Sequence, residues 1–210
     1  MKLHARHTFF SLMLIFCSIL LTLLISACGT SGTGGTTTIP TPTPTPTPAV
    51  NTYTGQGYTL NYPKDWTSSK TNYQVTGHEV PVSVFRDSLG KNTITIGVLP
   101  NPNGLFSVPT DISAVAALTG LSSSGKNYKQ VPMADKTTIA GQTWNQIAAT
   151  GDTTLQGTME NVKAVGLACN YPANSPNTSL YVIVYGGPTA TFDNTDRMVF
   201  QPTLKSFKFS

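Results

Sequence analysis

The strict alternation of proline and threonine over residues 40–48 constrains the fold of this chain more than any other feature. Proline fixes φ and removes a backbone donor, so such a run favours an extended polyproline II rod of about 3.1 Å per residue. Residues 29–38 contain only Gly, Ser and Thr, which offer too little apolar surface to join a core. We therefore expect a stalk over residues 28–49 and a single folded domain over residues 50–210.

The first 27 residues have the parts of a secretory leader. Lys2 and Arg6 supply a basic start, and an uncharged, mostly apolar run follows over residues 9–25. An uncleaved transmembrane anchor is the alternative, because about 17 apolar residues are just long enough to span a bilayer. Both interpretations place the bulk of the chain outside the cytoplasmic membrane.

The apolar run ends in Ile25-Ser26-Ala27-Cys28, a sequence typical of a bacterial lipobox. At such a box a signal peptidase cuts before a cysteine that already carries a diacylglyceryl group, here between Ala27 and Cys28. Two acyl chains hold a protein stably at a bilayer, whereas one does not. We therefore predict a signal peptide over residues 1–27 and a lipid anchor on Cys28, on the extracytoplasmic face of the cell membrane.

Charge and cysteine content narrow the function classes. Without the leader, 11 Lys and Arg face 9 Asp and Glu, and the cations are scattered, so nucleic acid is not an expected partner. Cys169 is the only thiol left once Cys28 is lipidated and Cys17 is removed, so no intramolecular disulfide is expected. Its apolar surroundings favour a buried structural cysteine, and the alternative is a nucleophile paired with His78, the only histidine of the mature chain.

Period-two alternation and turn residues predict a series of short antiparallel strands. Loops or turns are expected at residues 87–92, Ala140-Gly141, Gly151-Asp152 and residues 170–177. The expected strands cover residues 58–62, 80–86, 93–99, 128–139, 142–150, 159–169 and 179–185.

Two helices are expected beside these strands. The first begins after Pro109-Thr110 with Asp111 as its N-cap, and its buried candidates are Ile112, Val115, Ala116 and Leu118. The second is capped by Asp193 and Asp196 and is ended or kinked by Pro202 around Gln201. Its apolar positions are Phe200, Leu204 and Phe207. The fold class expected is α+β, with helices covering an antiparallel sheet.

Three short segments resemble PsbP-like domains: residues 57–66, which end in Tyr62-Pro63-Lys64-Asp65-Trp66, residues 139–144, and residues 204–209. The resemblance implies an antiparallel sheet between helical layers, an α/β/α sandwich, used mostly as a non-catalytic docking module. Members of that family include a photosystem II subunit, a Ran-binding factor, secretion adaptors and bacterial lipoproteins. With His78 alone, the chain lacks the histidine-rich metal positions of the photosynthetic branch, so no manganese, zinc or calcium role is carried over.

The sequence contains one partial match to a reactive motif. Gly120 to Gly125 followed by Lys126 has the spacing of a phosphate-binding loop, but Asn127 replaces the Ser or Thr that would hold Mg²⁺. Asp152, Asp193 and Asp196 could form a general acid/base group, although caps and turns explain them more simply. Asp65 and Asp87 are placed in turns. Glu79 and Glu160, the only glutamates, are placed on or beside exposed strand faces.

Aromatic residues allow a second kind of site. Tyr62, Trp66 and Trp144 could form a ligand platform, but packing in the core is the favoured interpretation. A deep pocket near Trp144 or Tyr185 would indicate a binder of small molecules or cell-wall glycans. A flat apolar patch would indicate a protein partner.

The sequence thus predicts a membrane-anchored lipoprotein with a non-catalytic domain that binds or scaffolds an envelope protein. No catalytic, cofactor-binding or metal-ligating residue is predicted, and no cofactor is expected. The alternative is a lipoprotein that binds a small molecule or a cell-wall glycan, and an enzyme is the least favoured class.

Replacing Cys28 with Ala should block lipidation and leave an unprocessed precursor, because the anchor is attached through that sulfur. Metabolic labelling with palmitate and the mobility of the precursor on a gel measure both effects. Palmitate incorporation that persists in Cys28→Ala would disprove the lipobox.

Overall fold

A computed structural model describes residues 49–75, 78–104 and 127–210. Residues Pro46–Ser210 form one compact unit. The leader, the lipobox and nearly all of the stalk lie outside the described residues. So do the helix expected to begin at Asp111 and the loop-like sequence at residues 120–126.

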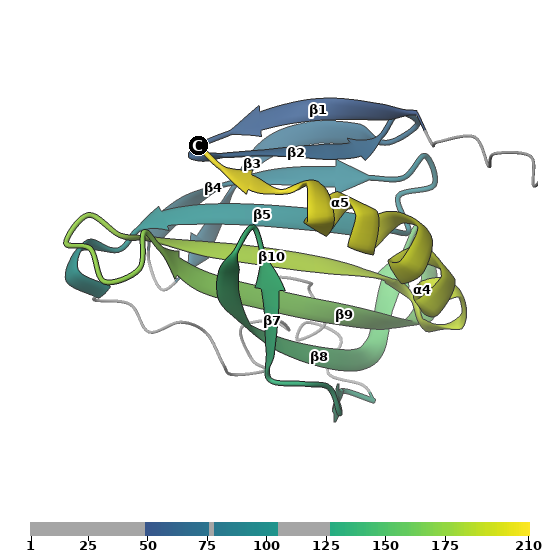
Figure 1. Cartoon of the computed structure of the whole chain (residues 1–210). Coiled ribbons are helices and arrows are strands. Elements are labelled where there is room, and N and C mark those ends of the chain that lie inside the picture. Colours follow the sequence, from purple (N-terminus) through teal and green to yellow (C-terminus); the bar gives the residue numbers. More distant parts are fainter. Residues whose placement is uncertain (1–48, 76–77, 105–126) are drawn as a thin grey trace, which may run out of the picture. The chain divides into compact units, whose positions relative to one another are not determined.

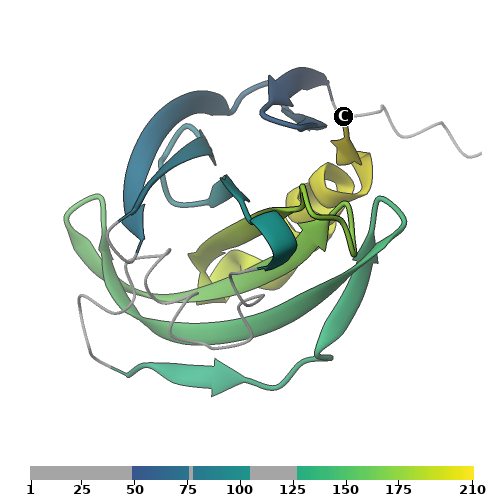
Figure 2. The same ribbon diagram turned by 90° about the vertical axis from the view of Figure 1, so that its left-hand side faces the viewer.

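The unit is built mainly from two antiparallel sheets (Figure 1). The smaller has the strand order β1-β2-β11, and the larger has the order β3-β4-β5-β10-β9-β8-β6, with β7 also paired to β8. Figure 2 shows that the larger sheet is strongly curved. The strands are β1 (Val50–Gly55), β2 (Tyr58–Pro63), β3 (Thr67–Val75), β4 (His78–Arg86), β5 (Thr93–Pro100), β6 (Lys129–Val131), β7 (Lys136–Ile139), β8 (Gln142–Leu155), β9 (Thr158–Tyr171), β10 (Ser179–Pro188) and β11 (Lys208–Phe209).

One helical segment packs on the larger sheet. It consists of α4 (Thr189–Thr195), the π-turn η3 (Asp196–Phe200) and α5 (Gln201–Ser206). A short 3₁₀ turn, η2 (Pro102–Gly104), follows β5. Within the described ranges no helix covers the other face of the sheet, so the expected α/β/α sandwich is wrong and the domain is mostly β. The expected antiparallel sheet is confirmed.

The course of the final helix differs from the expectation. The helix begins at Thr189, directly after Pro188, so Asp193 and Asp196 lie inside it and are not caps. Pro202 does not end it either. The π-turn lets the Gln201 N–H donate to the Asp196 carbonyl, and Pro202 then falls in the first turn of α5, where its missing N–H costs little.

Two strand predictions need correction, and strands β1 and β3 were missed. The segment expected as one strand over 128–139 is divided into β6 and β7. The predicted turn at Gly151-Asp152 is wrong, because β8 continues through it to Leu155. The chain turns instead at Gln156-Gly157, whose φ values of 50° and 81° suit a tight hairpin. Strand β3 was missed because its polar sequence has no alternation of apolar residues.

The core lies between the two sheets and the helical segment. The rings of Trp66 and Phe200 meet edge to face at 6.2 Å. Phe200 and Leu204 of the helical segment and Phe207, which directly follows it, are all buried, as predicted. Aromatic rings from the smaller sheet (Tyr58), the larger sheet (Trp144) and the C-terminal segment (Phe207) join the same cluster. Tyr62, Trp66 and Trp144 are buried in this cluster, so their expected core role is confirmed.

Replacing Trp66 with Ala should lower the free energy of unfolding by about 3–5 kcal/mol, because it empties a buried ring site against Phe200. The matched control is Leu89→Ala, since Leu89 is 66% exposed and should change stability by less than about 0.5 kcal/mol. Urea unfolding of the three proteins measures both changes. A loss below about 1 kcal/mol for Trp66→Ala would contradict the core assignment.

Candidate functional site

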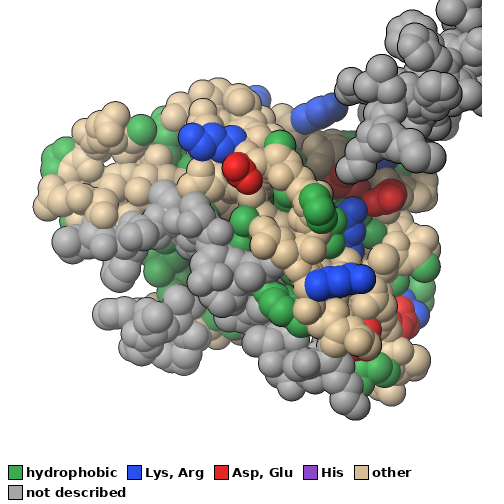
Figure 3. Space-filling view, turned by 90° about the horizontal axis from the view of Figure 1, so that it is seen from below, with side chains coloured by type: hydrophobic (Ala, Val, Ile, Leu, Met, Phe, Trp, Pro, Cys, Tyr) green, Lys and Arg blue, Asp and Glu red, His purple; other side chains and the backbone are tan. Residues whose placement is uncertain are grey.

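The exposed apolar side chains of the described residues are dispersed. Those that stand out are Val50, Leu89, Met133, Met159 and Met198, which come from five different elements or loops. On the face shown in Figure 3, apolar side chains form small separate patches and charged side chains are scattered between polar ones. The described residues therefore present no flat apolar patch of the kind that marks a protein-binding surface.

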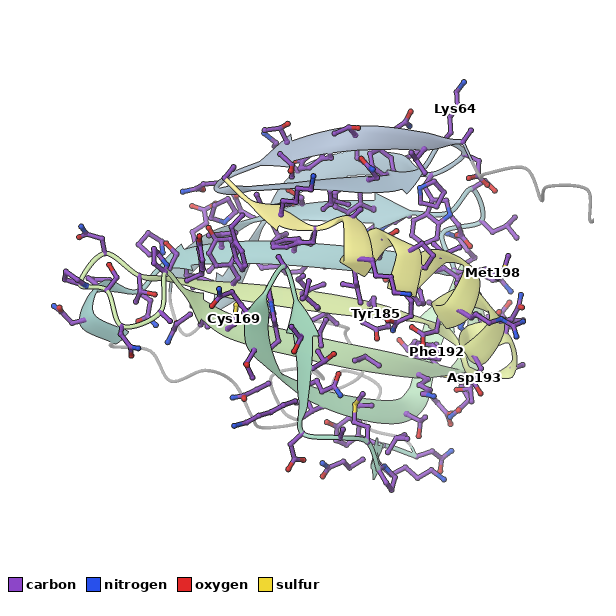
Figure 4. All side chains as sticks on the ribbon, in the orientation of Figure 1. Lys64, Cys169, Tyr185, Phe192, Asp193 and Met198 are labelled. Carbon is purple, nitrogen blue, oxygen red and sulfur yellow. The ribbon has the colours of Figure 1, made fainter. Side chains whose placement is uncertain are left out.

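Cys169 lies in the core and is not part of a reactive pair. Its side chain is 4% exposed, and burial raises the pKa of the thiol to about 12 (Figure 4). It belongs to β9, whereas His78 begins β4, and strands β5 and β10 lie between them in the sheet. With about 4.8 Å between neighbouring strands, their backbones are about 14 Å apart or more. The alternative of a nucleophile with His78 as its base is therefore wrong.

The candidate carboxylates have separate structural partners. Asp152 accepts a hydrogen bond from Asn161 at 2.8 Å, and Asp193 pairs with Lys163 at 3.1 Å. Asp196 accepts a hydrogen bond from the Gln201 side chain at 3.0 Å. Burial raises the pKa of Tyr185, and the nearby Asp196 raises it further. In the ranges that the structure describes, no three His, Cys, Asp or Glu side chains gather as a metal site would need.

The remaining acidic residues fall where the sequence placed them. Asp87 accepts hydrogen bonds from the Lys91 N–H and the Asn92 side chain, and Asp65 is an exposed residue of the turn after β2. Glu79 in β4 accepts a hydrogen bond from Asn72, and Glu160 in β9 pairs with Lys91. The aromatic platform is wrong, because Tyr62, Trp66 and Trp144 are at most 9% exposed.

A groove, called the sheet groove below, crosses the face of the larger sheet opposite the helical segment. It measures about 410 Å³, within the range of small-molecule sites, and apolar Val84, Val162 and Val184 line it together with Thr95. One end is bounded by the ion pair of Lys91 and Glu160, which joins the β4–β5 loop to β9. Arg86 also lines the groove, and its guanidinium has no hydrogen bond or ion pair to any described residue.

A second cavity of about 290 Å³ lies where the β1–β2 turn meets β3, β4 and β5. We call it the hydroxyl pocket, because Tyr53, Tyr58 and Ser83 line it. Pairing of β4 with β5 stops at Val82, next to Pro81, which has no N–H to donate to a further ladder bond. The divergence of the two strands at this point leaves room for the pocket.

Strand β3 forms one edge of the larger sheet. It pairs with β4 over nine residues, from Thr67↔Arg86 to Val75↔His78, and the sheet order gives it no second neighbour among the described strands. Its middle residues, Ser69, Lys70, Thr71 and Asn72, are exposed. Such an edge is a template for pairing with another strand.

Comparison with the known protein families finds none that matches this chain, and comparison with the curated proteins finds no match either. Among the described residues, none of the helices has both the length and the apolar character needed to cross a bilayer.

The sequence did not reveal the edge strand or the two cavities. Tyr58 was assigned to a strand, but nothing local showed that its hydroxyl would face Ser83, 25 residues further along the chain. The one available signal was Pro81, since a proline inside a strand pattern marks a break in the ladder. The deep pocket considered near Trp144 or Tyr185 is not what the structure shows, because both side chains are buried in the aromatic core.

Cys169 should react slowly with a thiol reagent in the folded protein and quickly after denaturation, because it is buried and remains a neutral thiol at neutral pH. The raised pKa also favours unfolding at high pH: the associated stability is present below about pH 9 and is lost as the pH rises toward 12.

Titration with a thiol reagent and urea unfolding between pH 8 and about 11 measure these effects. Cys169→Ala should show a shallower loss of stability over that range than the unaltered chain. Rapid labelling of the native thiol, or identical pH profiles for the two proteins, would contradict the assignment.

Proposed function

We propose that this chain is a membrane-anchored, extracytoplasmic lipoprotein whose non-catalytic domain binds another envelope protein by strand addition to β3. The lipobox at Cys28 and the stalk support the location, since a stalk lets a tethered domain reach a neighbour. The resemblance to PsbP-like domains supports a docking role, and we retain it as a proposal. The exposed edge of β3 is the observation on which the binding mode rests.

The edge suits an added strand for two reasons. Its outer backbone groups can supply a regular ladder of hydrogen bonds, which gives affinity without exposed apolar surface. Its side chains are short and polar along Ser68-Ser69, Thr71 and Asn72, so they do not obstruct a neighbouring backbone. Affinity from main-chain bonds fits a molecule whose exposed apolar residues are dispersed.

Lys70 supplies selectivity on this edge. A lysine in the middle of an edge strand discourages pairing with unselected strands, because its charge must stay solvated. Lys70 makes no hydrogen bond or ion pair with any described residue. A partner strand with a carboxylate opposite Lys70 would gain an ion pair there, while other strands would bury an unpaired charge.

A photo-crosslinking residue at Ser69 or Thr71 should capture a reproducible envelope protein in intact cells, whereas the same residue at exposed Leu89 should not. Lys70→Glu should reduce capture two- to fivefold at low salt, because an exposed ion pair contributes about 0.2–1 kcal/mol.

Lys64→Glu is the matched control, since it makes the same charge change at an exposed position outside β3 (Figure 4). Mass spectrometry of the crosslinked bands identifies and counts the products. Equal capture from Leu89, or equal losses for the two lysine variants, would refute the binding mode.

The second candidate is a lipoprotein that binds a small molecule in the sheet groove. The groove's volume favours this alternative, as does Arg86, which has no hydrogen bond or ion pair to a described residue. Native mass spectrometry of the full chain, extracted gently from its own membrane, should then show a bound compound that Arg86→Gln reduces. Detection of the bare protein alone would count against the groove as the principal site.

A further inference from the structure

The hydroxyl pocket lies beside the β3 edge, and its polar side chains offer more hydrogen-bond donors than acceptors. Tyr53 Oη and Ser83 Oγ share a hydrogen bond of 2.8 Å, in which one of the two hydroxyl protons is used. The other proton of that pair remains available to a ligand. Among the described residues that line the pocket, Lys70, on the β3 side, is the only charged one.

Tyr58 is the residue that sets the pocket apart from an ordinary surface hollow. Its side chain is 1% exposed, yet its hydroxyl, although close to Ser83, lies outside hydrogen-bond geometry to Ser83 and to every other described residue. An unpaired buried hydroxyl is costly, and a ligand that accepts a hydrogen bond from it removes that cost. Its ring stacks on Phe207 with centroids 5.4 Å apart and lies against Gly55, where any side chain would overlap it.

The protonation state of Tyr58 is fixed by its surroundings. Burial, the largest effect, raises the pKa of the phenol well above its ordinary value, and the nearby Ser83 hydroxyl only partly opposes this. Tyr58 is therefore a neutral O–H donor at neutral pH. The pocket then offers two O–H donors and one ammonium group. It therefore has more hydrogen-bond donors than acceptors to receive them.

We propose that the hydroxyl pocket binds a carboxylate, namely an aspartate or glutamate side chain of the segment that adds to β3. A carboxylate only accepts hydrogen bonds and carries the charge opposite to Lys70, so it matches both properties of the pocket. This inference rests on the proposed function, because β3 contributes Lys70, Thr71 and Asn72 to the lining. Glu79, which Asn72 holds at 2.6 Å, is not one of the lining residues.

This arrangement gives the two parts of the site different roles. Main-chain bonds along β3 would bind many extended segments with similar affinity, whereas a side-chain pocket next to the strand selects among them. The selected segment is one whose acidic side chain reaches the Tyr58 hydroxyl while its backbone pairs with β3.

Two peptides and one small acid test the proposal on the full chain in detergent micelles, with its tyrosine rings labelled with ¹³C. The first peptide alternates threonine and valine around a central glutamate, the second has glutamine instead, and the acid is glutarate. The glutamate peptide should shift the Tyr58 resonance to saturation and bind about tenfold or more tightly than the glutamine peptide, as expected for a hydrogen-bonded charge.

Tyr58→Phe should reduce binding of the glutamate peptide about tenfold without unfolding the protein, since the hydroxyl that it removes has no partner. Tyr185→Phe is the matched control. It removes another buried phenol, which lies under the helical segment, and should leave binding unchanged. Thermal unfolding of both variants confirms that each is folded.

The outcomes distinguish failure of the carboxylate pocket from failure of strand addition to β3. Equal binding of the two peptides, with changes along β3 only, would overturn the carboxylate pocket and retain the proposed function. A glutarate response at Tyr58 without peptide binding would retain the pocket for a free acid and refute strand addition. No shift at Tyr58 with any probe, or equal effects of Tyr58→Phe and Tyr185→Phe, would overturn the pocket.

Discussion

The packing of Phe207 against the rings of Tyr58, Trp144 and Tyr181 is the contact on which the rest of the domain depends. Its ring stacks on Tyr58 of the smaller sheet and meets Trp144 and Tyr181 of the larger sheet edge to face, at 5.7 and 6.4 Å. The residues that follow it form β11, which pairs with β2. One residue near the C-terminus thus joins the first hairpin of the domain to the larger sheet. Because each ring buries a large apolar area, these contacts hold the smaller sheet in place better than the two residue pairs of β11 could.

The position of the smaller sheet in turn creates the hydroxyl pocket. The Tyr181 hydroxyl donates a hydrogen bond of 3.1 Å to the Gly57 carbonyl, which fixes the β1–β2 turn above the larger sheet. Gly57 has a φ of 74° and lies so close to Tyr181 that a side chain there would clash. Tyr58 follows directly, so the same turn that anchors the hairpin also directs a phenol into the space left by Pro81. The pocket is therefore a consequence of how the two sheets are held together, and its shape should be rigid.

Much of the sheet could be predicted from the sequence, because residues such as Ile94, Ile96 and Val98 alternate as a half-buried strand must. The burial of Trp66 and Phe200 followed from size and apolarity alone. The errors arose where local patterns compete with tertiary contacts. Gly151-Asp152 has turn chemistry, but pairing with Val162 and Asn161 of β9 keeps it extended. Strand β3 is polar and gains its structure from β4, so no local pattern could reveal it. The hydroxyl pocket was missed because its residues come from strands β1 to β5, which only tertiary contacts bring together.

The proposed tether would lower the affinity that binding at the β3 edge requires. The proposed lipid anchor would confine the protein and its membrane-bound neighbours to a thin layer, and the proposed stalk would then turn weak binding into frequent contact through a high local concentration. Main-chain pairing along β3 with one selective carboxylate can then suffice, without the large apolar interface that a freely diffusing protein requires. The dispersed exposed apolar residues agree with weak binding of this kind, as does Lys70, which has no ion pair among the described residues. A long apolar edge strand would pair without selection among crowded neighbours. The polar β3 edge, in the binding mode proposed here, would limit pairing to strands that satisfy both its backbone and its charge.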